Sequence, residues 1–199
     1  MKEAGTVRIG LAVKSGGETL SALLTRLYGT AGIPIWIQLL TESKKSGTIE
    51  TSVFEKRAEP CEVMCFDILL VDEDIAAVER FAPGSVRAGV TVVNTDEKGC
   101  RVPAHGGRVV SFGLNGKSCV TASSVDDETM MICLQRAFPA VNGAMVERME
   151  FALRRAAGGP APRPLIAAVS VALCGGLRPE EIAAFFAAED KNVHAGHIL

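Results

Sequence analysis

The sequence predicts an α/β fold, in which a parallel sheet is extended by antiparallel hairpins and followed by helices. Two observations carry this prediction. In the first half of the chain, short apolar runs typical of buried parallel strands alternate with turns and helical spacing. In the second half, successive runs alternate as half-buried strands do, and Asn142-Gly143, a strong type I′ hairpin signal, separates the last two.

The first unit of the sheet is a strand, a glycine-rich turn, a helix and a second strand. Val7–Val13 is a continuous apolar run, and Lys14–Gly17 is the turn after it. Over Thr19–Ala31, leucines recur at spacings that place them on one helical face, so a helix is expected there. Ile33–Leu40 reads as the second strand, which a right-handed crossover would set parallel to the first.

The same criteria predict the remaining elements. Further strands are expected at Ile49–Phe54, Phe66–Val71, Ala88–Asn94, Val109–Phe112, Cys119–Val125, Thr129–Ala137 and Ala144–Leu153. Further helices are expected at Ile75–Phe81, at Leu165–Cys174, and from Pro179 to about Ala188. Asp126–Glu128 is expected to be a turn. We expect one domain over residues 1–188 and a flexible tail over residues 189–199, where periodicity is lost.

Composition limits the classes of function. The 199 residues are 48% hydrophobic and 22% charged, as in ordinary globular proteins, and the net charge of −2 favours neither nucleic acid nor an anionic membrane. The N-terminus has no apolar signal region, and the apolar stretch Leu165–Leu177 is too short to span a bilayer, so a cytoplasmic protein is expected. None of the six cysteines forms a C-x-x-C pair, which favours small buried residues over a metal site.

Two segments come close to the pattern of a phosphate-binding loop. Such a loop needs backbone N–H groups and a helix N-terminus that converge on the anion, with a lysine beside them. The first segment, Val13–Thr19, stands between a strand and a helix, but Glu18 occupies the lysine position. The second, Gly113-Leu114-Asn115-Gly116-Lys117-Ser118, has the right residues but is followed by a strand-like sequence. We expect it to be a turn between two strands with Asn115-Gly116 as the hairpin residues and Lys117 solvated; the alternative is a phosphate site.

The order of these segments resembles the central domain of the Mur ligase family, the ATP-dependent amide-forming ligases of peptidoglycan and folylpolyglutamate synthesis. The segments that carry the resemblance, between residues 6 and 188, are VRIGLAV with the SGGETLSALLTRLYGTAG after it, FDILLVDED, TVVNTDE, VVSFGLN, CVTASSV and PLIAAVSVALCGGLRPEEIAAF. The resemblance implies a P-loop-NTPase-like three-layer α/β sheet, with an antiparallel hairpin extension and C-terminal helices. The other two ligase domains of the family have no room in this chain.

The departures from the family pattern bear on activity. The family's Gly-Lys-Ser/Thr supplies a lysine to the phosphates and a hydroxyl to Mg²⁺; here Gly17 and Thr19 match, and Glu18 does not. A carboxylate beside a triphosphate is repulsive by about 1–4 kcal/mol per charge pair. The family also has a histidine in the helix after the FDILLV-like strand, where this chain has Ala76–Val78. The resemblance therefore implies a degenerate Walker A loop.

Two hypotheses about function follow. The first is a non-catalytic binding or assembly module, a pseudoenzyme without a cofactor that associates with a protein partner or with itself. Its remaining anion-binding residues would be Ser15, Gly16, Gly17 and Thr19. The alternative is a divergent ATP-dependent amide ligase or phosphate-binding enzyme that uses ATP and Mg²⁺. Its phosphate contacts would be Lys14, Gly113, Asn115, Gly116, Lys117 and Ser118.

A few acidic and histidine residues are weaker candidates. Asp72 and Asp74 follow a buried strand, where α/β sheets place ligands and metals, although a negatively charged helix cap is the plainer interpretation. His194 and His197 would share a face on a helix, but we expect a loose tail there. His105 is expected to be an exposed loop residue.

Overall fold

The computed structural model describes residues 5–13, 15–40, 63–72, 86–97, 106–155 and 160–196, and in this part of the chain ten strands form two sheets. The larger sheet has eight strands in the order β10-β7-β6-β5-β4-β3-β1-β2. The strands are β1 (Val7–Ala12), β2 (Ile35–Leu39), β3 (Met64–Val71), β4 (Val86–Asn94), β5 (Gly106–Phe112), β6 (Val120–Val125), β7 (Thr129–Leu134), β8 (Phe138–Pro139), β9 (Met145–Val146) and β10 (Met149–Arg154). The helices are α1 (Gly17–Thr30), α3 (Pro162–Cys174) and α4 (Pro179–Gly196). The fold is therefore α/β, with a mostly parallel sheet flanked by helices.

The parallel half of the sheet contains β1 to β6, and β1, β3 and β4 are buried on both faces over their carboxyl-terminal halves. β1 lies between β2 and β3, and β4 and β5 continue the parallel ladder. On β3, the neighbouring residues Ile68 and Leu69 point to opposite faces, and both are fully buried in different apolar clusters. Burial on both faces explains why these strands read as continuous apolar runs.

The antiparallel half begins where β5 and β6 meet through the single pair Phe112 and Val120. β6, β7 and β10 are antiparallel neighbours, as the alternating sequence predicted. The turn between β6 and β7 is confirmed: the carboxylate of Asp126 accepts hydrogen bonds from the N–H groups of Glu128 and Thr129, at 3.0 and 2.6 Å.

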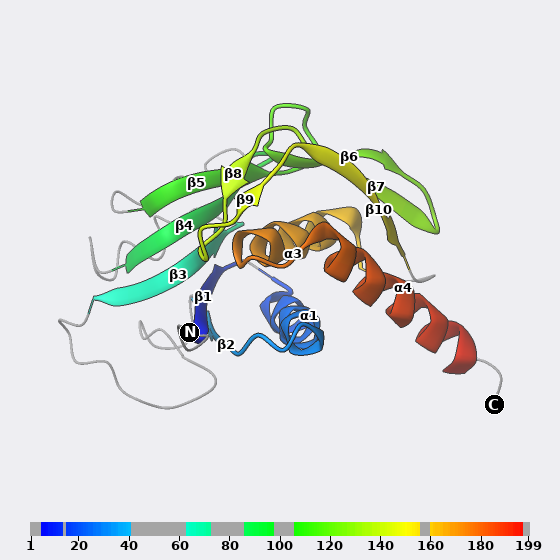
Figure 1. Ribbon diagram of the computed structural model, residues 1–199, viewed down its shortest axis with the longest axis horizontal. Helices are drawn as coiled ribbons and strands as arrows, with labels where there is room; N and C mark the ends of the chain where they lie inside the picture. The colour runs from blue at the N-terminus through cyan, green and yellow to red at the C-terminus, as the bar shows by residue number, and fades with distance from the viewer. Residues whose placement is uncertain are drawn as a thin grey trace.

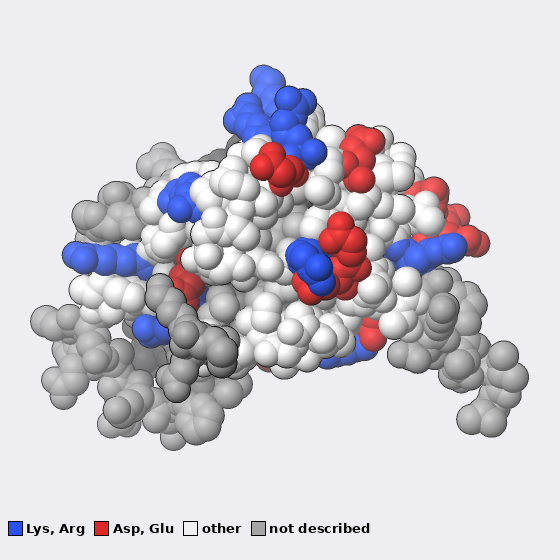
Figure 2. Space-filling model, viewed as in Figure 1, with Lys and Arg blue, Asp and Glu red and all other residues white. Residues whose placement is uncertain are grey.

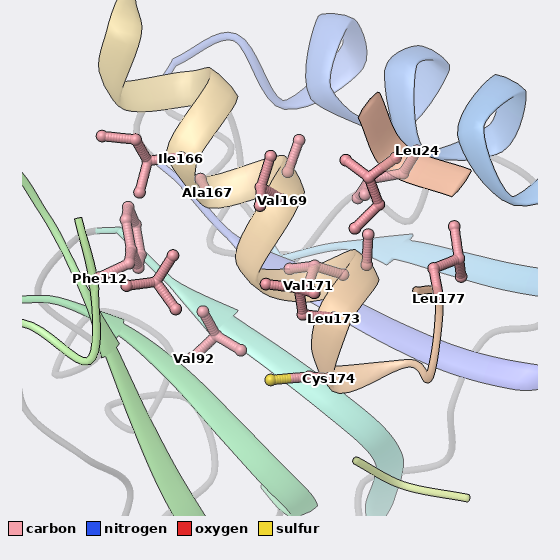
Figure 3. Packing of buried hydrophobic residues seen from close by; sticks show 14 of the residues in the cluster. Leu24, Val92, Phe112, Ile166, Ala167, Val169, Val171, Leu173, Cys174 and Leu177 are labelled. Carbon is pink, nitrogen blue, oxygen red and sulfur yellow. The ribbon is translucent and has the colours of Figure 1, made fainter. Parts of the chain in front are cut away.

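The three described helices lie on one side of the sheet, which arches over α3 (Figure 1). α3 is the central helix of the core, because it packs between the sheet and α1. In Figure 3, Val92 and Phe112 approach α3 from the sheet and Leu24 approaches it from α1. Every residue of α3 from Leu165 to Cys174 is buried, which explains why this helix is apolar all round.

The predicted hairpin at Asn142-Gly143 was right in position and wrong in partners and type. The turn joins β8 and β9, which pair only with each other in the small sheet, and not β7 and β10. The N–H of Ala140 donates to the carbonyl of Ala144 at 2.8 Å, and the N–H of Gly143 donates to that of Ala140 at 3.0 Å. These bonds close a three-residue loop with Gly143 at φ +86°, where a left-handed residue is needed, so it is not the two-residue type I′ turn.

Several predicted boundaries also moved. The expected strand Ala144–Leu153 is divided into β9 and β10, and the expected strand Thr129–Ala137 ends at Leu134. The last helix continues to Gly196, past its predicted end near Ala188, so most of the segment 189–199 has a helical backbone; its flexibility stays a prediction. The elements expected at Ile49–Phe54 and Ile75–Phe81 lie outside the described residues.

The structure also tests the predictions for the cysteines and for a membrane-spanning helix. Cys174 is buried as expected, Cys119 and Cys133 are half-buried, and Cys65 is exposed, while Cys61 and Cys100 lie outside the described residues. Within the described ranges, no helix combines the length and the apolar character that crossing a membrane requires.

Candidate functional site

The polar residues of the candidate site follow the carboxyl ends of neighbouring parallel strands. β1, β3, β4 and β5 are parallel neighbours, so their carboxyl ends meet at one edge of the sheet. The segments that follow them are Ser15–Gly17, Asp72, Thr95–Glu97 and Gly113–Ser118. The structure thus places both loops that resemble phosphate loops at the same edge.

The first loop leads directly into α1. Gly16 precedes the helix with φ +73°, a left-handed conformation that favours glycine, and no side chain caps the helix. The N–H of Leu20 makes the first helical hydrogen bond, to the carbonyl of Gly16 at 2.9 Å. Gly17 is buried, and a Cβ there would lie 2.9 Å from Cγ2 of Val13. Among the described residues, no side chain caps this helix, so the loop presents a helix N-terminus with uncapped N–H groups.

The charge at this helix N-terminus belongs to Glu18. Glu18 and Thr19 lie in the first turn of α1, and both are exposed, as is Ser15 before the helix. A carboxylate at this position interacts favourably with the helix dipole. The same negative charge repels a phosphate that approaches the helix end. Lys14 lies outside the described residues.

The second loop binds a carboxylate of the protein itself. Asp96, which follows β4, accepts hydrogen bonds from the N–H groups of Leu114 and Asn115, at 2.6 and 3.1 Å, and from Nδ2 of Asn115 at 2.8 Å. Two successive backbone N–H groups aimed at one anion form the kind of concavity that elsewhere holds a phosphate. Burial acts to raise the pKa of Asp96, but these hydrogen bonds from Leu114 and Asn115 outweigh it and lower the pKa.

The same loop corrects part of the prediction for Gly113–Ser118. β6 follows it, as expected, but β5 and β6 are parallel, so Asn115-Gly116 are not hairpin residues. A turn closes instead where the N–H of Ser118 donates to the carbonyl of Asn115 at 3.2 Å. The hydroxyl groups of Ser118 and Thr95 share a hydrogen bond of 2.6 Å, which ties the end of the loop to the segment after β4.

Lys117 is exposed on this loop, as predicted, and lies far from α1. β3 and β4 separate β5 from β1 in the sheet. Three strand spacings amount to about 14 Å, which exceeds the length of a lysine side chain. Lys117 is therefore too remote to place a positive charge at the first loop.

Asp72 lies between the two loops. Its N–H donates to the carbonyl of Ala12 at 2.9 Å, which places it beside the end of β1. Its carboxylate accepts a hydrogen bond from Nδ2 of Asn94 and lies 3.6 Å from Nε of Arg163, at the start of α3. Burial raises the pKa of Asp72, while Asn94 and Arg163 act in the opposite direction.

Arg163 joins two strand ends, and sequence reasoning missed it, as it missed Asn94, Asp96 and Glu97. Its Nη1 also donates to Oε1 of Glu97 at 2.7 Å, across 66 positions of sequence. Asn94 and Asp96 were recognisable, because a polar run directly after a buried strand is a common place for a site. No local pattern marks Arg163, since its partners Asp72 and Glu97 are distant from it in sequence.

The structure tests the predicted metal site at Asp72 and Asp74 only in part, because only Asp72 is among the described residues. Asp74 and His105 lie outside the described residues, as does His197, the partner of His194. Among the residues that are described, no three or more His, Cys, Asp or Glu side chains group in a way that suits a metal ion.

Comparison with known proteins adds no assignment. No protein-family model matches the sequence, and no curated protein matches it. The arrangement of the site is therefore the basis for a functional proposal.

Proposed function

We propose that this chain is a Mur-ligase-like domain with a P-loop-like, three-layer sheet, and that it acts as a non-catalytic binding or assembly module. The observation that carries the proposal is Glu18, which is exposed in the first turn of α1 where a phosphate-binding loop needs its lysine. The helix begins directly after the first strand, as in such loops, but the charge is reversed.

The rest of the sheet edge supports the same conclusion. Asp72, Asp96 and Glu97 follow β3 and β4, and the cation described beside them, Arg163, is held by Asp72 and Glu97. A triphosphate at this edge would meet repulsion of about 1–4 kcal/mol for each close carboxylate. The N–H groups of Leu114 and Asn115, which could otherwise bind a phosphate, already bind Asp96.

What remains at α1 is a site for a small anion at most. In the part of the chain that the structure describes, no side chain caps the backbone N–H groups of the first turn, which lie beside Ser15, Gly16, Gly17 and Thr19. Binding there would depend on the helix N-terminus alone and would be weak.

The module is proposed to act in the cytoplasm on protein partners, without nucleic acid or membrane. Figure 2 shows a group of basic side chains at the top of the molecule with acidic side chains directly beside it, and further basic and acidic side chains scattered over the same face. A face of mixed charge gives no continuous basic stripe of the kind that nucleic acid and anionic lipid attract.

Calorimetric titration with ATP and Mg²⁺ tests the proposal. We expect no micromolar binding to the wild-type protein, and a gain of affinity in Glu18→Lys that the charge-neutral control Glu18→Gln does not reproduce. Micromolar binding of ATP to the wild-type protein that disappears in Thr19→Ala would refute the proposal.

The alternative is a divergent ATP-dependent ligase or phosphate-binding enzyme, with Mg²⁺, that uses Lys14 or Lys117. The exposure of Lys117 at the same edge of the sheet is the observation that favours it. It requires that Lys117→Ala or Lys14→Ala abolish nucleotide binding. If neither variant binds differently from the wild-type protein, this alternative fails.

A further inference from the structure

In the described part of the chain, β10 forms one edge of the eight-stranded sheet, and β7 is the strand that pairs with it. Its residues alternate in exposure. Leu153 is fully buried and Phe151 is half-buried beneath the sheet, where α4 packs against the strand. Glu150, Ala152 and Arg154 lie on the opposite face, and all three are exposed.

The backbone of the same three residues points away from β7. The N–H of Arg155 donates to the carbonyl of Glu128, at the end of the β7–β10 ladder. In an antiparallel pair, alternate residues direct both backbone groups to the same neighbour. Because Arg155 bonds to β7, the backbone groups of the odd-numbered residues of β10 also point toward β7. The backbone groups of Glu150, Ala152 and Arg154 therefore point outward, away from β7.

We propose that a second copy of this chain pairs with β10 along this edge, antiparallel and across a twofold axis that passes beside Ala152. In this register, Ala152 faces Ala152 of the other copy, and Glu150 faces Arg154 of the other copy on both sides of the axis. The interface is isologous, and it extends the sheet from one copy into the next.

The charges select this register from the others that the edge allows. Residues with outward backbone groups must face one another, so the pairing can shift only in steps of two residues. The register centred on Glu150 sets that carboxylate against its own copy, and the register centred on Arg154 does the same with its guanidinium. Registers centred on Phe151 or Leu153 pair a charged residue with Ala152. Only the register centred on Ala152 forms two Glu–Arg pairs, on the exposed face of the sheet.

The strand is suited to a copy of itself for two further reasons. Ala152, at the axis, is small enough for two β10 strands to approach to normal sheet spacing without a side-chain clash. In the part of the chain that the structure describes, Glu150 and Arg154 form no ion pair, so both charges are available to a partner.

A charge-swap series tests the pairing with the full chain. Dissociation constants from sedimentation velocity over a concentration series should rise about tenfold in Glu150→Arg and in Arg154→Glu, and should return close to the wild-type value in the double variant. Asp127→Arg and Arg136→Glu make the same changes of charge at exposed positions outside β10 and should leave the dissociation constant unchanged.

Disulfide trapping provides a second measurement that does not depend on charge. Opposite residues of a hydrogen-bonded antiparallel pair have Cα atoms about 5.5 Å apart. This separation lies within the range of about 4.4–6.8 Å that a disulfide spans. Ala152→Cys should therefore form a covalent dimer on mild oxidation, beyond any background shown by the wild-type cysteines and by Asp127→Cys.

The two measurements can either support or overturn the pairing of β10 with a second copy. Loss of the dimer in the single variants, recovery in the double variant and cross-linking through residue 152 support the pairing. A wild-type protein that stays monomeric at every concentration overturns it, and so does a dimer that the charge reversals leave unchanged. In the monomeric case, Glu150 and Arg154 protect the edge from association.

Discussion

The two loops at the carboxyl edge of the sheet have opposite arrangements of charge. The loop before α1 has a helix N-terminus and no side-chain cap, but its first turn carries the carboxylate of Glu18. The loop Gly113–Ser118 has the lysine and no helix, and its N–H groups already bind the carboxylate of Asp96. One loop has the geometry of an anion site without its charge, and the other has an anion site that the protein fills itself.

The comparison shows why a motif at this edge cannot be interpreted residue by residue. A phosphate loop requires free backbone donors, a helix dipole and a cation at one point. Here Lys117 lies about three strand spacings from α1, roughly 14 Å, so the parts do not meet. Three substitutions sharpen the difference between the loops.

The largest effect is expected from Gly113→Ala. Gly113 has φ +156°, which strains an L-residue, and a Cβ at this position would also lie 2.7 Å from Oδ1 of Asp96, so the carboxylate would have to leave its donors in the loop. We expect the free energy of unfolding to fall by about 2–3 kcal/mol, measured by urea denaturation.

Gly116→Ala is the matched control in the same loop, since its Cβ would meet nothing within 4 Å. A change of less than about 0.5 kcal/mol is expected there. Equal losses in both variants would show that Asp96 does not hold the loop.

Asp96→Asn should have the next largest effect, and the effect should depend on pH. The amide replaces one acceptor of the Leu114 and Asn115 hydrogen bonds by a donor, with an expected loss of about 1–2 kcal/mol at neutral pH, limited because water competes at this exposed residue.

The sign of the pH dependence follows from the lowered pKa of Asp96. Its carboxylate stabilises the fold above the ordinary value of 3.8, and this contribution is lost as pH falls through the lower pKa of the folded state. The melting temperatures of wild-type and variant proteins should therefore converge in acid. A difference that is constant from neutral pH to acid would exclude the charged carboxylate as the cause.

The smallest effect is expected from Gly16→Ala in the first loop. Gly16 has φ +73°, where an L-residue is strained by about 1 kcal/mol, while nothing lies within 4 Å of the new Cβ. Gly29→Ala, inside α1 with equally open surroundings, should instead stabilise the protein by up to about 1 kcal/mol. Thermal unfolding of the two variants should show a lower melting temperature for Gly16→Ala and a higher one for Gly29→Ala. A stabilising Gly16→Ala would contradict the left-handed turn before the helix.

The elements that the sequence predicted well are those whose pattern is local. β1, α1, β2, β3, β4 and β6 were found to within a few residues. Continuous apolar runs mark β1, β3 and β4, which are buried on both faces, and leucines at helical spacing mark α1. Predictions failed where pairing between distant segments decides. The sequence shows that Asn142-Gly143 is a turn, but only the fold shows that this turn joins β8 and β9.

The candidate site was predictable in part for the same reason. The sequence predicted the two loops and Asp72 as site residues and showed Glu18 where a phosphate loop needs a lysine; it did not predict the polar run after β4. The bond from Leu114 to Asp96 and the position of Arg163 between Asp72 and Glu97 are not, because each joins residues that are distant in sequence.

The sequence by itself determined the α/β class, the order of its main strands and helices, and the presence of a glutamate at the start of α1, where a phosphate loop needs a lysine. These features depend on residue periodicity and on single residues at turns. Only the tertiary structure decided that the Gly113–Ser118 loop binds Asp96, that Lys117 is remote from α1, and that β10 is an edge. Each of these depends on which strands become neighbours, which is a property of the assembled sheet that no local segment contains.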